Sequence, residues 1–224
     1  MRFAALETST EWCSVALWRE GEIAGVERRA GNRHSELALP MLDKLLKRFG
    51  MTPRELDAVA FGAGPGSFTG LRIACGLAQG LALARAIPVL GVSSLTALAD
   101  EAGAPRVGAC IDARMREVYY AALERADGAW RELIAPQCIS PSAVSAPGPE
   151  WIGAGSGFAV YGNMGFRKVL PEAHPTAIAV ARLAAPRLAA GEGIDAALAA
   201  PIYVRDKVAF TKAELAQANS GSGS

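Results

Sequence analysis

Apolar residues along this 224-residue chain fall into short runs separated by turn residues, and these runs predict alternating strands and helices. The first half begins with a three-stranded meander. The meander is expected at residues 2–6, 13–18 and 23–28. The rest of this half has expected strands at residues 56–61 and 89–92 and expected helices at residues 34–49, 69–86 and 95–101. A new series of strands follows the Gly103-Ala104-Pro105 break, at residues 106–111, 118–123 and 130–134. The pattern therefore predicts two consecutive α/β units.

The two units share features that indicate a tandem duplication. A strand ending in Glu7 corresponds to a strand ending in Asp112, two further strands follow each, and both units then have a Gly-Ala-Gly loop. This order predicts an α/β protein with the duplicated actin/hexokinase/Hsp70-like fold. The second unit has fewer long helices, the main one being Ala-rich at residues 175–190, so we expect a reduced second lobe.

The same pattern suggests how the chain is divided. We expect a first lobe at residues 1–103 and a second, reduced lobe at residues 104–200. A short apolar segment begins at Pro201, and we expect residues 201–219 to pack back on the lobes. The Gly/Ser repeat at residues 220–224 predicts a disordered tail.

A glycine-rich loop, Phe-Gly-Ala-Gly-Pro-Gly-Ser-Phe-Thr-Gly-Leu-Arg at residues 61–72, connects a predicted strand to a predicted helix. Ser67 and Thr69 are good N-cap residues, so the helix should begin there. Backbone N–H groups at such a start can hold an anion, but no Gly-Lys-Ser/Thr follows, so the Walker A pattern is absent. Ser67 also lacks the Gly-x-Ser-x-Gly context of a nucleophile elbow. The pattern favours a strand-to-helix turn over a phosphate cradle.

The helices at residues 34–49 and 69–86 both have features of contact surfaces. In the second helix, Gly76 and Gly80 lie on one face, and each mid-helix glycine costs roughly 1 kcal/mol relative to alanine. We interpret the pair as allowing close approach of another helix, within the fold or from a partner. The first helix has an apolar stripe wider than one buried face needs, which is either a partner surface or core. His34, at its start, is interpreted as a helix-start or interface residue.

Composition narrows the possible functions. Lys and Arg number 23 and Asp and Glu number 22, giving a net charge of +1, so any nucleic-acid role would need a more basic partner. The four cysteines are scattered and no signal peptide is visible, which predicts a reduced, cytoplasmic protein without membrane contact. The two histidines, His34 and His174, have no ligand-spaced companions, so no metal site is expected.

The loops that follow Glu7 and Asp112 are the candidates for nucleotide binding. In the duplicated ATPase fold, each lobe offers an Asp-then-Gly loop to the phosphates. Neither loop here has the glycine that allows close backbone approach, so we assign no catalytic residue and no cofactor. The residues left as weak candidates for nucleotide binding are Thr8, Ser9, Thr10, Asp112 and Arg114.

Several segments, taken in order, resemble the TsaB (YeaZ) family. They are residues 6–10 and 13–17, His-Ser-Glu and Leu-Pro-Met at 34–36 and 39–41, Gly-Pro-Gly-Ser-Phe-Thr-Gly-Leu-Arg at 64–72, Asp-Ala-Arg and Glu-Val-Tyr at 112–114 and 117–119, and Pro201, Tyr203 and Arg205. The resemblance covers nearly the whole chain, and the segment at 64–72 is very specific. Glu7 stands where the family usually has Asp, which argues against an inherited phosphate-binding role.

The resemblance implies a scaffold subunit for making threonylcarbamoyladenosine (t6A) on the 3′ side of the anticodon, in tRNAs that read codons beginning with A. It implies binding to the transferase TsaD, a larger relative whose metal-binding His pair this chain lacks. It also implies association with the ATPase TsaE, homodimers when alone, tRNA contact only through the complex, and nucleotide either weakly bound or at the partner interface.

The family's contact surface uses the first two helices of the first lobe. Carried over, the expected interface residues are His34, Leu37, Ala38, Met41, Leu42, Leu45, Thr69, Arg72, Ile73, Gly76 and Gly80. An alternative stays open, in which the chain is a self-sufficient weak ATPase or a peptidase of the same fold. The missing loop glycines, the missing metal ligands and the near-zero net charge favour the scaffold.

Overall fold

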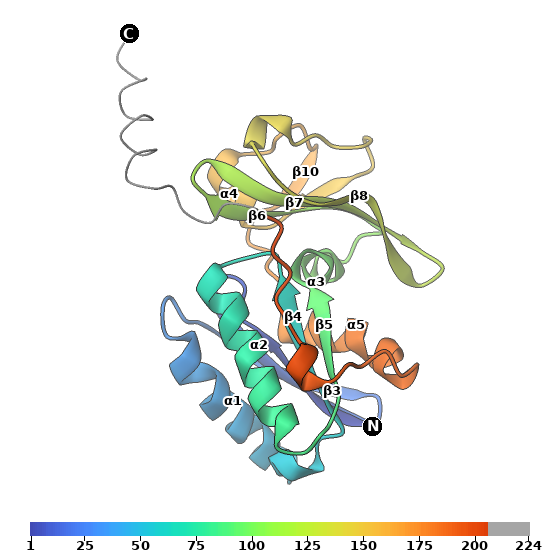
Figure 1. Ribbon diagram of the computed structural model, residues 1–224. Helices are drawn as coiled ribbons and strands as arrows, with labels where there is room; N and C mark the ends of the chain where they lie inside the picture. Colours follow the sequence, from blue (N-terminus) through green and yellow to red (C-terminus); the bar gives the residue numbers. More distant parts are fainter. Residues whose placement is uncertain (206–224) are drawn as a thin grey trace.

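The computed structural model describes residues 1–205, and the expectations for residues 206–219 and for the tail at 220–224 lie outside this range. Two five-stranded sheets form the two lobes (Figure 1). The first sheet has the order β3-β2-β1-β4-β5, with β1 (Arg2–Glu7), β2 (Trp12–Arg19), β3 (Glu22–Arg29), β4 (Ala58–Gly64) and β5 (Val89–Ser93). The second has the order β10-β9-β6-β7-β8, with β6 (Arg106–Arg114), β7 (Glu117–Ala126), β8 (Ala129–Ile139), β9 (Ile152–Ala154) and β10 (Lys168–Leu170).

The two sheets repeat one topology. In each, the first strand is central, an antiparallel pair of strands follows on one side, and two parallel strands lie on the other side. This repetition confirms the duplicated actin/hexokinase/Hsp70-like fold. In the second lobe, the helix between β9 and β10 is only α4 (Ser156–Tyr161), which agrees with a reduced lobe.

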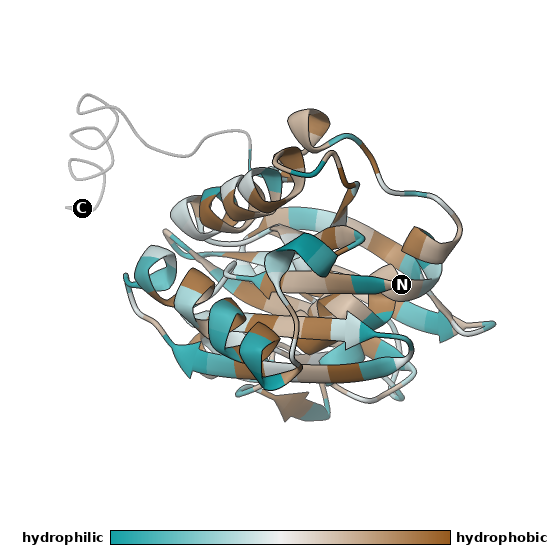
Figure 2. Ribbon diagram, turned by 90° about the horizontal axis from the view of Figure 1, so that it is seen from below, coloured by the Kyte–Doolittle hydropathy of each residue, from teal (hydrophilic) through white to brown (hydrophobic). Residues whose placement is uncertain are grey.

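Helices cover both faces of the first sheet because its central strand is apolar on both sides. Ala4 and Leu6 of β1 face α1 (His34–Arg48) and α2 (Phe68–Leu83). Phe3 and Ala5 face α5 (Ala177–Ala189) on the opposite side. The hydropathy colours of Figure 2 show mainly hydrophobic strands between helices that carry both kinds of residue. Three short 3₁₀ helices, Pro53–Glu55, Pro141–Ala143 and Ala196–Leu198, complete the described elements.

Helix α5 packs on the first sheet, whereas the division at residue 103 grouped its residues with the second lobe. Its buried side is almost entirely alanine, with Val180 and Leu188, and the small alanine side chains let the helix lie close to the strands of the first sheet.

Helix α2 begins as expected, with Ser67 as N-cap accepting from the Gly70 N–H, but ends at Leu83 rather than at residue 86.

Helix α3 (Ser94–Glu101) lies between the lobes (Figure 1). Its apolar side chains, including Leu95 and Leu98, share a core cluster with Val107 and Ala109 of β6. The helix therefore belongs to the first lobe by chain order and forms part of the core of the second.

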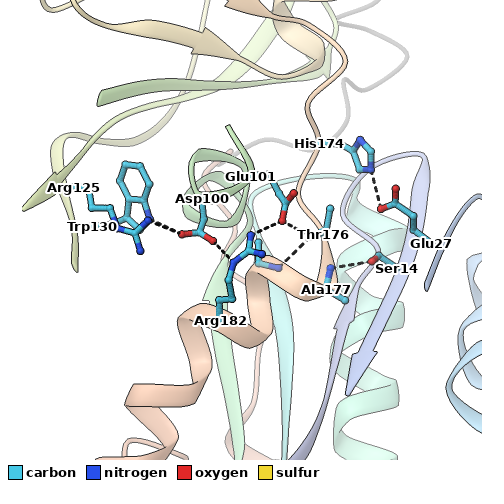
Figure 3. A network of polar contacts seen from close by, with 11 residues as sticks. Ser14, Glu27, Asp100, Glu101, Arg125, Trp130, His174, Thr176, Ala177 and Arg182 are labelled. Atoms are coloured by element: carbon cyan, nitrogen blue, oxygen red, sulfur yellow. Dashed lines mark hydrogen bonds and ion pairs between the residues drawn. The ribbon is translucent and has the colours of Figure 1, made fainter. Parts of the chain in front are cut away.

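Polar contacts at the end of α3 add a second connection between the lobes (Figure 3). Asp100 accepts hydrogen bonds from Arg182 Nε of α5 at 2.7 Å and from Trp130 Nε1 of β8 at 3.2 Å. Glu101 Oε1 accepts from Arg182 Nη2 at 2.7 Å and from Thr176 Oγ1 at 2.9 Å. Asp100 thus joins the β7–β8 hairpin of the second lobe to α5, and the neighbouring Glu101 adds two further bonds from α3 to Arg182 and Thr176.

Candidate functional site

The loop after β1 is organised around a buried carboxylate, that of Glu7, which is 1% exposed. Glu7 Oε1 accepts the Ser9 N–H at 2.6 Å, and Oε2 accepts the Ser94 hydroxyl at 2.9 Å. Burial raises the pKa of Glu7, although its hydrogen bonds from Ser9, Ser94 and Thr8 act in the opposite direction. The carboxylate lies against Gly62, where a Cβ atom would overlap Oε2. Glu7 therefore holds β1, β4 and the start of α3 together.

The glycine-rich loop covers the residues that follow Glu7. Thr8 Oγ1 donates to the Gly70 carbonyl at 2.7 Å, and the Ser67 N–H donates to the Ser9 carbonyl at 2.7 Å. A Cβ atom at Gly70 would overlap the Thr8 carbonyl oxygen, so this glycine is needed for the packing of the two loops. Thr8 and Ser9 are buried, and a nucleotide phosphate would have to displace the glycine-rich loop to reach them.

Thr10 is half-buried and is likewise used in the fold. Its carbonyl lies 2.9 Å from His34 Nε2, and its hydroxyl accepts the Trp12 N–H at 3.3 Å. His34 was interpreted as a helix-start or interface residue. It is buried at the start of α1, which favours the first interpretation and contradicts its expected place at a partner interface. The first-lobe candidates for nucleotide binding are therefore occupied by contacts within the chain.

In the second lobe, Asp112 organises the turn between β6 and β7. Its Oδ1 accepts the Arg114 N–H at 3.1 Å and the Tyr161 hydroxyl at 3.4 Å, and its Oδ2 lies 3.3 Å from Arg114 Nη1. Arg114, Met115 and Arg116 all have left-handed backbone conformations, with φ of 61°, 56° and 60°. Asp112 thus stabilises an unusual turn, while the Arg114 side chain extends into solvent.

The apolar stripe of α1 points inward. Ala38, Met41, Leu42 and Leu45 belong to the core cluster beneath this helix and are each at most 5% exposed. These four residues were expected at a partner interface, and that expectation is wrong for the folded monomer. The stripe is wide because α1 packs against the first sheet and also adjoins α2. Leu37 is half-buried at its edge.

Helix α2 presents an uncovered face that we call the α2 face, consisting of Thr69, Arg72, Ile73, Gly76 and Gly80. All are exposed except Ile73, which is half-buried. A Cβ atom at Gly76 or Gly80 would meet no atom within 4 Å. The inward side of the helix is made of other residues, including Leu71, Ala74 and Ala78. Neither glycine is therefore required by packing within residues 1–205.

The C-terminal segment at residues 201–205 runs from this helix to the second lobe. The Ile202 N–H donates to the Ala63 carbonyl at 2.7 Å, and Tyr203 contacts Arg72 and Phe68 at the start of α2. Arg205 binds Glu117 and the Arg114 carbonyl of the second lobe. The sequence indicated that this segment packs back on the lobes but carried no signal for the Tyr203 contact.

Two further observations concern the described residues. Between residues 1 and 205, no three side chains among His, Cys, Asp and Glu gather as a metal site requires. None of the helices in this part of the chain is both long enough and apolar enough to cross a membrane.

Comparison with known proteins identifies the family. The family model described as "TsaD: tRNA N6-adenosine threonylcarbamoyltransferase" matches residues 26–212. The tRNA threonylcarbamoyladenosine biosynthesis protein TsaB of Escherichia coli strain K12 is 37% identical, covering 95% of this chain and 98% of its own length. The Haemophilus influenzae protein of the same name is 38% identical, with 93% and 95% covered. This chain belongs to the TsaB family.

A solved structure of YeaZ from Pseudomonas aeruginosa agrees with this assignment, at 41% identity and a TM-score of 0.85, covering 90% of this chain and 99% of that one. A second Pseudomonas aeruginosa structure, described as having similarity to peptidase YeaZ, has the same identity and TM-score, with 91% and 99% covered. The comparisons confirm the resemblance to the TsaB family drawn from the motif at residues 64–72.

Proposed function

We propose that this chain is a non-catalytic subunit that binds a TsaD-type transferase, joined by a TsaE-type ATPase. The complex would add the threonylcarbamoyl group to the adenosine on the 3′ side of the anticodon, in tRNAs that read codons beginning with A. The names of the TsaB relatives support the pathway. The observation that carries the subunit role is the open α2 face with its two exposed glycines.

Gly76 and Gly80 lower the stability of α2, and this loss of stability is the argument for a partner at the α2 face. Each lowers helix stability by roughly 1 kcal/mol relative to alanine, and no packing within the described residues requires either of them. Without side chains, they let the backbone of a second helix approach closely. A stable complex through this face should bury on the order of 1,200–2,000 Å² in total. The same face is available for a homodimer when the partner is absent.

The absence of catalysis by this chain alone is supported by how its candidate groups are used. The Ser67 hydroxyl accepts the Gly70 N–H as a helix cap. Both histidines lie in other contacts, His34 with the Thr10 carbonyl and His174 stacked on Trp12 and bonded to Glu27. A net charge of +1 supports tRNA contact through the complex rather than by this chain alone.

A binding experiment tests this proposal. Gly76→Gln and Gly80→Gln should each raise the thermal stability of the isolated chain, because glutamine is the better helix former by up to about 1 kcal/mol. The same changes should abolish co-purification with the TsaD-type subunit of the same organism. Ala189→Gln, exposed at the end of α5 on the other side of the sheet, is the matched control and should leave binding intact. Wild-type binding by both glycine variants would overturn the assigned surface.

The competing hypothesis is a self-sufficient ATPase or peptidase. Purified chain should show little ATP or peptide hydrolysis and no transfer to tRNA. Robust ATP turnover that is lost in Asp112→Ala would overturn the non-catalytic assignment.

A further inference from the structure

Arg72 is the charged residue of the α2 face. It lies one helical turn before Gly76 and two turns before Gly80, so the three residues share one side of the helix. The other members of the face are Thr69 and Ile73. A helix that approaches over the glycines would therefore bring its own side chains to the Arg72 guanidinium.

Two contacts hold this exposed guanidinium in place, and a third joins the two aromatic rings that make them. Arg72 Cζ stands 3.7 Å from the centroid of the Phe68 ring, and Arg72 Nε donates to the Tyr203 hydroxyl at 3.1 Å. The Phe68 and Tyr203 rings lie 5.7 Å apart, so the C-terminal segment closes the cluster. An unconstrained surface arginine samples many rotamers, whereas these contacts order Arg72 before any partner arrives.

Within the described part of the chain, the outer nitrogens of Arg72 have no acceptor. Within residues 1–205, no carboxylate lies within 4.0 Å of Arg72, and only its Nε donates a hydrogen bond. Arg182 is the contrast, because its Nε and Nη2 bind Asp100 and Glu101. An arginine stacked on an aromatic ring keeps its in-plane donors available, and their fork matches a carboxylate.

We propose that Arg72 binds a carboxylate of the TsaD-type partner, and that Tyr203 is a positioning residue for this contact. The inference rests on the proposed function and names the group that the partner must present. The α2 face holds one cation among small and apolar residues, whereas a surface for RNA phosphates needs several cations. This composition favours a protein carboxylate over a phosphate.

Calorimetric titration of the TsaD-type subunit into the variants tests the proposal. Arg72→Gln should weaken binding about tenfold to a hundredfold and reduce its salt dependence. Arg72→Lys should restore part of the affinity, because it keeps the charge and loses the fork. Tyr203→Phe keeps the ring but removes the hydroxyl that accepts from Arg72. It should weaken binding severalfold in the wild-type chain. In the Arg72→Gln variant it should have no further effect, because the two residues act through the same contact. Arg131→Gln, an exposed arginine of the second lobe, is the control.

The outcomes separate this inference from the proposed function. If wild-type chain binds and Arg72→Gln binds equally well, the carboxylate contact is overturned while the subunit role stands. If wild-type chain does not bind, the proposed function itself fails. If Arg72→Gln assembles normally but the assembled complex loses affinity for tRNA, the anion is a phosphate and the inference is overturned. Equal effects of Tyr203→Phe in both backgrounds would remove its positioning role.

Discussion

At the scale of single residues, three glycines determine how the first-lobe loop is built. At Gly62, Gly66 and Gly70, an added Cβ atom would overlap Glu7, Ser9 and Thr8 respectively. Gly66 and Gly70 therefore allow one segment of backbone to lie directly on another, and Gly62 leaves room for the Glu7 carboxylate. A loop rich in glycine at the start of a helix often binds phosphate, but here the close approach is made by the protein's own chain.

The buried carboxylate predicts a pH-dependent difference in stability. Burial raises the pKa of Glu7 above its ordinary value of 4.5, so the folded protein holds this proton more tightly than the unfolded chain. The resulting stability is fully present below the unfolded pKa and is lost as pH rises through the folded pKa. We expect the free energy of unfolding of wild type minus that of Glu7→Gln to fall as pH rises above 4.5.

Urea denaturation across this pH range measures the difference. Glu132→Gln is the control, because Glu132 is exposed on β8 and its replacement should leave the pH profile unchanged. Parallel pH profiles for wild type and Glu7→Gln would contradict the prediction.

At the scale of elements, α1 and α2 both bury an apolar side but differ in the residues that they present to solvent. The apolar stripe of α1 is buried against the first sheet, and its outward residues, such as Lys44 and Lys47, are polar. Helix α2 also buries an apolar side, but the α2 face on its outward side has two glycines and a single charged residue, Arg72. The surface available to a partner is therefore centred on α2, with the edge of α1 beside it.

Because the apolar stripe of α1 points into the core, shortening a side chain of this stripe should destabilise the folded protein. Leu45→Ala should lower the free energy of unfolding by about 2–5 kcal/mol, because it leaves a cavity in the core. Leu39→Ala, on the exposed side of the same helix, should change it by no more than about 0.5 kcal/mol. Chemical denaturation monitored by circular dichroism compares the two. Similar losses from both variants would mean that the stripe is not oriented as described.

At the scale of the whole molecule, the lobes are joined at several places. Helix α3 shares the core of the second lobe, α5 packs on the first sheet, and residues 201–205 cross from Ala63 to Glu117. The network around Asp100 adds a polar connection on the side of the β7–β8 hairpin (Figure 3). These connections are consistent with the scaffold role proposed above, in which the chain would present one surface in a constant orientation.

Weakening the polar connection should loosen the hairpin. Asp100→Asn removes a carboxylate that accepts from Arg182 and Trp130, and we expect a loss of about 1–3 kcal/mol in the free energy of unfolding. Hydrogen exchange should rise in the β7–β8 hairpin and at the start of α5. Asp127→Asn, in an exposed ion pair of the same hairpin, is the control and should have little effect. Faster exchange confined to α1 and α2 would contradict this role.

The sequence by itself determined the strand runs, the duplicated order, the cap at Ser67 and the TsaB motif at residues 64–72. These features depend on local periodicity, capping and chain geometry, which neighbouring residues specify. It also showed that Gly76 and Gly80 share a face of α2.

Only the tertiary structure decided which way the helices face and what the loops bury. The stripe of α1 could serve as core or interface with the same periodicity, and packing against the first sheet made it core. Thr8 and Ser9 became inaccessible because a loop some sixty residues away covers them, as the Thr8–Gly70 hydrogen bond shows. The contact between Arg72 and Tyr203 joins positions 131 apart in the chain. Such long-range contacts arise from how the elements pack, which local pattern does not specify.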